Sequence, residues 1–248
     1  MKIKRKAPKP SSQDRPAFLV GWSFDAPSPT DLTFWFDLEY GGPLKLQPST
    51  PSRMTASHAL WNTSLVWPLS QAESEQWQSQ LGWSHSQVSM VLHRSAPPAA
   101  MRDMQLLQSR LARGLTLLSE GTSYDVLTGT FWNPSDWRDR PLSTFDLHDH
   151  VTILHPDTED VTSEWFRTAG LVKFGLDELE VARPRGLSSQ PTVDCLLAIA
   201  EELLHNGQNP KVGSALSVQE APSPVEVVGH RTIPHAMGPL AVRRVRWA

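Results

Sequence analysis

Two stretches of the chain show the apolar spacing of amphipathic helices. Over residues 98–120, large apolar side chains recur three or four positions apart and therefore share one helical face: Met101, Met104, Leu107, Leu111, Leu115 and Leu118. Residues 191–206 repeat this spacing, with Pro191 in the first turn and Asn206-Gly207 at the end. We predict these two segments as the main helices, and Gly121 is placed to end the first of them in a left-handed conformation.

Short apolar or alternating runs around these helices predict β-strands. The runs assigned in this way are Ala17–Phe24, Leu32–Tyr40, Trp61–Trp67, Val88–His93, Tyr124–Gly129 (with a turn), Phe145–Leu154, Trp165–Leu171, Leu179–Val181, Val225–Arg231 and Ala241–Trp247. Residues 44–57 lack such a pattern, and we expect an irregular loop there. Residues 69–77 predict a short helix, because Ser70 and Glu73 have the spacing of a capping box and Gly82 ends the segment.

The order of these elements predicts an α+β fold. Strands precede and follow each helix without regular βαβα alternation, so we expect a mixed or antiparallel sheet with the two main helices packed on one face. A chain of 248 residues can bury a substantial core. We predict a disordered basic tail over residues 1–16 and a single α+β domain over residues 17–248. The alternative is two subdomains that meet near residues 133–144.

Charge is distributed unevenly along the chain. The formal net charge is −3, and residues 1–16 hold six basic side chains against one acidic, so the other residues carry a net charge of −8. An acidic body is not typical of a dedicated nucleic-acid-binding protein. No apolar run reaches the roughly 18 residues of a membrane helix, and the N-terminus lacks the apolar stretch of a signal peptide. The single cysteine, Cys195, agrees with a reducing compartment, so we expect a cytoplasmic protein.

Ten tryptophans are the most unusual feature of the composition, and eight of them precede residue 138. Indoles mostly fill apolar cores. Residues 131–140, however, are polar and turn-rich around two indoles, and loops of this composition usually run over the surface. Trp132 and Trp137 are therefore our candidate anchors for a protein partner. The alternative is that both rings fold back and cover the edge of a sheet.

The common catalytic motifs are absent from the sequence. It contains no phosphate-binding glycine-rich loop, no His-Glu-x-x-His and no paired cysteines. Gly21-Trp-Ser-Phe-Asp25 begins like a nucleophile elbow but has aspartate where the second glycine belongs. One group of metal-ligand type remains: on a strand, Asp146, His148 and His150 would share one face and could bind zinc or iron. The alternative is a strand with a solvated polar face.

The segment Thr168–Val181 resembles a motif of an uncharacterised bacterial family, domain of unknown function 4261. The shared positions are Gly170-Leu171, Phe174-Gly175 and Glu178-Leu179-Glu180. The resemblance covers roughly residues 98–218. It implies a fold but no catalytic residue, because the family has no settled activity.

Two hypotheses for function follow. The first is a non-catalytic protein-binding protein of the immunity, adaptor or assembly type, with no cofactor and with Trp132 and Trp137 at the interface. The second is a metal-dependent hydrolase that uses Asp146, His148 and His150. The missing catalytic motifs and the aromatic content favour the first.

Overall fold

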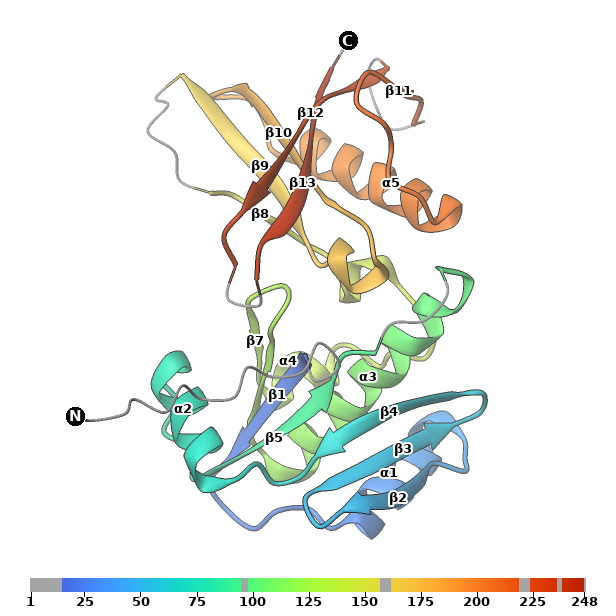
Figure 1. The fold of residues 1–248 in the computed structure, drawn as a ribbon, viewed down its shortest axis with the longest axis vertical. Coiled ribbons are helices and arrows are strands. Elements are labelled where there is room, and N and C mark those ends of the chain that lie inside the picture. The colour runs from blue at the N-terminus through green and yellow to red at the C-terminus, as the bar shows by residue number, and fades with distance from the viewer. Residues whose placement is uncertain (1–14, 95–97, 157–161, 219–223, 236–237, 248) are drawn as a thin grey trace, which may run out of the picture.

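The computed structural model describes residues 15–94, 98–156, 162–218, 224–235 and 238–247. These residues form two β-sheets, one above the other in Figure 1. The first has seven strands in the order β2-β3-β4-β5-β1-β6-β7, and all its neighbours pair antiparallel. The second has six strands in the order β11-β12-β13-β10-β9-β8, antiparallel except for β10 with β13. The predicted α+β class is confirmed.

The first sheet and its helices form what we call the N-terminal unit. Its strands are β1 (Pro16–Trp22), β2 (Lys45–Thr50), β3 (Arg53–His58), β4 (Trp61–Val66), β5 (Gln87–Leu92), β6 (Thr122–Asp125) and β7 (Thr130–Trp132), and its helices are α1 (Pro29–Tyr40), α2 (Gln71–Leu81), α3 (Pro98–Ser119) and α4 (Pro134–Arg138). The predicted stripe of α3 packs on the sheet, with Leu111 and Leu115 fully buried beside Trp22, Phe36 and Trp137. The capping box of Ser70 and Glu73 is present at the start of α2.

The second sheet and one long helix form the C-terminal unit. Its elements are η1 (Leu147–Asp149), β8 (Thr152–Leu154), β9 (Ser163–Ala169), η2 (Leu171–Phe174), β10 (Glu178–Pro184), α5 (Gln190–Asn206), β11 (Ala215–Leu216), β12 (Val225–Ile233) and β13 (Leu240–Trp247). Helix α5 packs on one face, where Leu196 and Ile199 meet Phe166 and Val181. The two main helices therefore serve different sheets, α3 the first and α5 the second (Figure 1).

The strand predicted over Leu32–Tyr40 is wrong, because this segment is helix α1. The side chain of Ser28 accepts a hydrogen bond from the backbone N–H of Asp31, and the carboxylate of Asp31 accepts one from the N–H of Ser28. This capping box, with Pro29 in the first turn, starts a helix in spite of the β-prone aromatic residues that follow. The helix then buries one stripe against α3 and the first sheet, Leu32 and Phe36.

Two other local predictions are also corrected. Residues 44–57 form most of the β2–β3 hairpin and not an irregular loop. Gly121 is not the left-handed residue that ends α3, since Glu120 takes that conformation with φ of 48°. Gly121 is needed for space, because a Cβ there would lie 2.1 Å from the carbonyl oxygen of Gly21.

The chain passes from the first sheet to the second between β7 and β8. The subdomain alternative places its junction near residues 133–144, within this crossing. Whether residues 17–248 fold as one domain stays a prediction. The predicted tail lies outside the described residues up to residue 14, and β1 already begins at Pro16. Within the described ranges, every helix is too short or too polar to cross a membrane.

Candidate functional site

The two indoles predicted as surface anchors lie in different environments. Asn133 caps α4 by accepting hydrogen bonds from two backbone N–H groups, so this polar segment folds as a helix and not as a surface loop. The helix turns Trp137 inward: the side chain is 2% exposed, and its Nε1 donates to the Ser123 hydroxyl at 2.7 Å. Trp132 is half-buried against the same core, under the guanidinium of Arg140 at 4.4 Å. A surface anchor at Trp137 is therefore excluded.

The predicted metal-ligand face is also corrected. Residues 145–151 are not a strand: Asp146 caps the turn η1 by accepting from the N–H of His148, and both side chains are exposed. His150 is 1% exposed, and its ring stacks on Phe145 at 4.8 Å. The strand periodicity behind the prediction does not apply. Within the described ranges, no three histidine, cysteine, aspartate or glutamate side chains are grouped as a metal site would require.

A buried ion pair joins the two units. Lys173, on η2, donates to Asp125 Oδ2 of β6 at 2.5 Å and to the carbonyl oxygen of His150 at 2.8 Å. Lys173 and Asp125 are each 1% exposed. Gln105 of α3 donates to the carbonyl of Lys173 at 3.2 Å. Lysine, aspartate and histidine are common catalytic types, but here they are sealed from solvent and hold the units together.

The segment Thr168–Val181, which carries the family resemblance, forms a turn held by a buried carboxylate. Glu178 is fully buried, and its carboxylate accepts from the Thr168 hydroxyl at 2.7 Å and from the backbone N–H groups of Gly170, Leu171 and Val172. Burial raises the pKa of Glu178, and these four hydrogen bonds oppose the increase. Gly170 has φ of 123°, and a Cβ there would lie 2.2 Å from the carbonyl of His150. The motif therefore builds the turn that presents Lys173 to the N-terminal unit.

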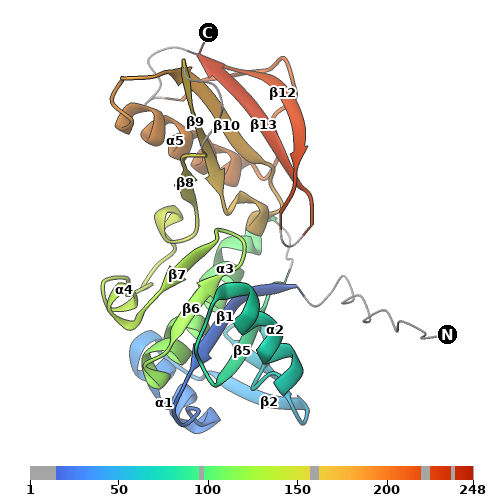
Figure 2. The same cartoon turned by 90° about the vertical axis from the view of Figure 1, so that its left-hand side faces the viewer.

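The face of the second sheet opposite α5 presents a cluster of arginines. Strand alternation sends the apolar residues of β9, β10, β13 and the first half of β12 toward α5 and their neighbours to the other side. The bulge in β12 between Val227 and Gly229 then places Arg231 on that other side as well. In the described part of the chain, no helix covers that side (Figure 2). We call it the arginine face and define it by Trp165, Arg167, Glu180, Glu226, Arg231, Arg244 and Arg246.

A buried carboxylate organises the arginine face. The side chain of Glu180 is 2% exposed, and it accepts two hydrogen bonds from Arg231, at 2.8 and 2.5 Å, and one from Arg244 at 3.2 Å. The side chains of both arginines remain nearly half exposed. The same two guanidinium groups lie over Trp165, Arg244 at 4.7 Å and Arg231 at 5.9 Å from the ring. Glu180 and Trp165 thus fix two exposed cations in place.

The arginine face is positive although the chain is acidic. Arg167 stands directly across from Glu180 on β9 and has no hydrogen-bond or ion-pair partner among the described residues. Across β12 and β13, the Arg246 guanidinium pairs with the carboxylate of Glu226 at 2.8 Å. Four guanidinium groups therefore face two carboxylates. Nearby His235 adds little charge at neutral pH, because burial, and then the charge of Arg167, lower its pKa.

Sequence reasoning placed β9, β10, β12 and β13 but missed this face. A signal was present: Arg244 and Arg246 alternate on one predicted strand, and Trp165 and Arg167 alternate on another. What the sequence does not give is the strand order β9-β10-β13-β12, which brings residues 165–167, 180, 231 and 244–246 onto one surface.

Comparisons with family models, curated proteins and solved structures found no match to this chain. The resemblance of residues 98–218 to domain of unknown function 4261 therefore stays a prediction.

Proposed function

We propose that this protein is a non-catalytic binding protein that recognises an acidic surface of another protein through the arginine face. The observation that carries the proposal is the fixed pair Arg231 and Arg244, held by buried Glu180 over Trp165. Arginine and tryptophan are the residue types that most often dominate binding energy at protein interfaces. Two guanidinium groups already held in position lose little further entropy when a carboxylate binds them.

The burial of Glu180 supports a binding role over a stabilising one. A buried ion pair is on average no more stabilising than apolar residues of the same volume, because both charges lose their hydration. The middle of an exposed sheet face would be stable with ordinary polar residues. Glu180 instead directs two arginines outward at defined positions, which suits bidentate recognition of carboxylates.

The charge of the whole chain favours a protein partner over a nucleic acid. Residues beyond the first sixteen carry a net charge of −8, which repels a long polyanion, whereas the local excess of positive charge can meet a compact acidic patch. The chain has one cysteine, Cys195, which is buried, so it can form no internal disulfide, and this supports a cytoplasmic setting for the interaction.

The test compares partner capture from native cells by variants of the purified protein. Arg167→Gln removes a charge that has no ion-pair partner among the described residues and places no second carboxylate opposite Glu180, so the fold should remain intact. We expect at least a tenfold loss of captured partner, on the order of one interface charge pair. Arg138→Gln makes the same change at an exposed position on α4 and should capture as much as the wild type. Equal capture by both variants would contradict the proposal.

A second variant removes the fixed arginines without leaving a buried charge. Arg231→Gln and Arg244→Gln are combined with Glu180→Gln, so that no unpaired carboxylate remains in the sheet. We expect this triple variant to fold and to lose capture. Tighter binding of the wild type to a single-stranded oligothymidine than to any captured protein would assign the face to nucleic acid and overturn the proposal.

A further inference from the structure

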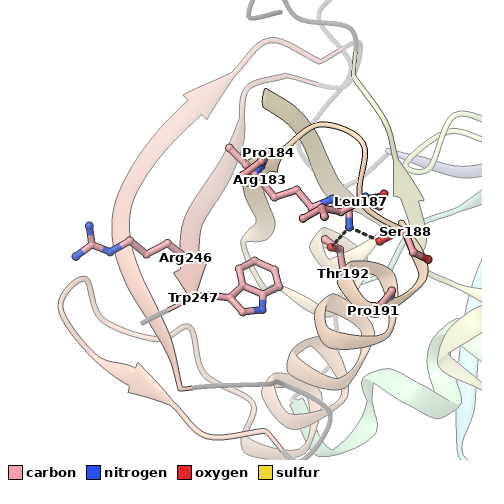
Figure 3. Close-up of a pocket in the computed structure, with 9 residues that line it drawn as sticks. Arg183, Pro184, Leu187, Ser188, Pro191, Thr192, Arg246 and Trp247 are labelled. Atoms are coloured by element: carbon pink, nitrogen blue, oxygen red, sulfur yellow. Dashed lines mark hydrogen bonds between the residues drawn. The ribbon is translucent and has the colours of Figure 1, made fainter. Parts of the chain in front are cut away.

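A cavity of about 460 Å³ lies on the α5 side of the second sheet, between the end of the sheet and the first turn of α5. Figure 3 shows the indole of Trp247 turned toward Thr192 and Pro191, with Leu187 and Arg183 on the adjoining wall. Its volume is within the range of natural ligand pockets, roughly 300–1,000 Å³. Most of its lining is apolar.

The walls of the cavity are held in place by Arg183. Its guanidinium donates to the carbonyl oxygens of Leu187 and Ser188 and to the Thr192 hydroxyl, and it pairs with Glu164 at 2.5 Å. These bonds fix the loop between β10 and α5 and leave the arginine little capacity for a charged ligand. Pro184 and Pro191 restrict the backbone at both ends of the loop.

The chemistry of the lining selects an apolar, ring-shaped occupant. The indole of Trp247 provides a flat wall against which another ring can stack, and Leu187, which is 60% exposed, covers one side. The Thr192 hydroxyl is already bonded to Arg183. A polar group in the cavity would therefore give up its hydrogen bonds to water and find few new ones. An aromatic hydrocarbon ring has no such hydrogen bonds to give up.

The cavity and the arginine face lie on opposite sides of the sheet and adjoin at the end of β13. Arg246 lines the cavity, but its side chain points away from the other lining residues (Figure 3), toward Glu226 on the arginine face. The next residue, Trp247, points to the opposite side of the strand. A chain that crosses the end of the sheet can therefore place carboxylates near the arginines and one side chain in the cavity.

We infer that the cavity binds an aromatic side chain carried by an acidic segment of the partner protein. This inference rests on the proposed function, and it names the part of the partner that is recognised. The positive face selects the acidic residues, and the apolar cavity selects the ring between them.

The test uses two synthetic heptapeptides with fluorescein labels, one with phenylalanine and the other with alanine between two runs of three glutamates. Fluorescence anisotropy measures their affinity for the full chain. We expect the phenylalanine peptide to bind about tenfold more tightly, which corresponds to roughly 1.4 kcal/mol. Trp247→Ala should abolish this ratio, and Leu187→Ala, at an exposed position, should reduce it about threefold. The matched control is Val212→Ala, 52% exposed and outside the cavity lining, which should keep the ratio.

The outcomes separate the two proposals. If both peptides bind equally and Arg167→Gln weakens both, the arginine face is supported and the cavity inference is wrong. If neither peptide binds, both are wrong. If indole or octanoate displaces the phenylalanine peptide and binds more tightly than it does, the cavity is a small-molecule site and the side-chain anchor is overturned. A retained ratio in Leu187→Ala and Trp247→Ala would also contradict the inference.

Discussion

The two units place their tryptophans differently. In the N-terminal unit, Trp22, Trp67 and Trp137 are buried, and the other five indoles pack against an apolar cluster. The buried core of the C-terminal unit contains aliphatic side chains and phenylalanine, together with Cys195, but no tryptophan among the described residues. Its two indoles are half-buried, Trp165 under arginines and Trp247 beside a cavity. Tryptophans are thus buried in the core of one unit, whereas in the other they lie at the candidate binding surfaces, where Trp247 also packs against the edge of the core.

The largest expected effect tests this comparison directly. Trp137→Ala should lower the free energy of unfolding by about 3–5 kcal/mol, the range for truncating a large buried aromatic residue. It also removes the donor to the Ser123 hydroxyl. Trp165→Ala should cost about 1 kcal/mol or less, since the indole is at the surface and belongs to no apolar cluster. Urea unfolding measures both, and similar losses would remove the distinction between the units.

Much of the fold could be predicted because its signals are local. The stripe of α3, the capping box of α2 and the Gly207 stop of α5 each depend on residues within a few positions. Where two local signals conflict, the pattern misleads: the aromatic residues of α1 predict a strand, whereas the capping pair Ser28 and Asp31 starts a helix.

The candidate site could not be predicted, because it depends on contacts between distant segments. The polar loop around Trp137 was expected at the surface, but the Asn133 cap turns the indole toward Ser123. Glu180 meets Arg231 and Arg244, which lie 51 and 64 residues further along the chain. Strand order decides these contacts, and a single sequence does not state it.

A smaller effect is expected at the ion pair that joins the two units. Lys173→Met keeps most of the buried volume but leaves the Asp125 carboxylate without its counter-ion. We expect a loss of about 3 kcal/mol, typical of breaking a buried pair from one side. Adding Asp125→Asn removes the stranded charge and keeps an oxygen for the N–H groups of Leu127 and Thr128. The double variant should therefore regain much of the loss, and a double variant no more stable than Lys173→Met would contradict this account.

The smallest expected effect is a loss of folding stability at low pH, and it arises from two histidines near Lys173, where the two units meet. Burial, and then the charge of Lys173, lower the pKa of His93 to about 4, and the same two causes hold the pKa of His150 well below its ordinary value. Both histidines stay neutral in the fold, whereas in the unfolded chain they bind protons below a pKa of about 6.5. Their contribution to stability is therefore complete above pH 6.5 and is lost as the pH falls toward 4.

For His93 alone we expect a loss of about 2 kcal/mol between pH 7 and pH 4. Glu178 acts in the opposite direction, because its raised pKa makes the fold more stable as the pH falls. The wild type is therefore compared with His93→Gln, since Glu178 contributes equally to both and cancels in the difference. As the pH is lowered from 7 to 4, the urea midpoint of the wild type should decrease more than that of the variant. Parallel pH profiles would show that His93 is not held neutral, and the acid response would then not arise from this histidine at the junction.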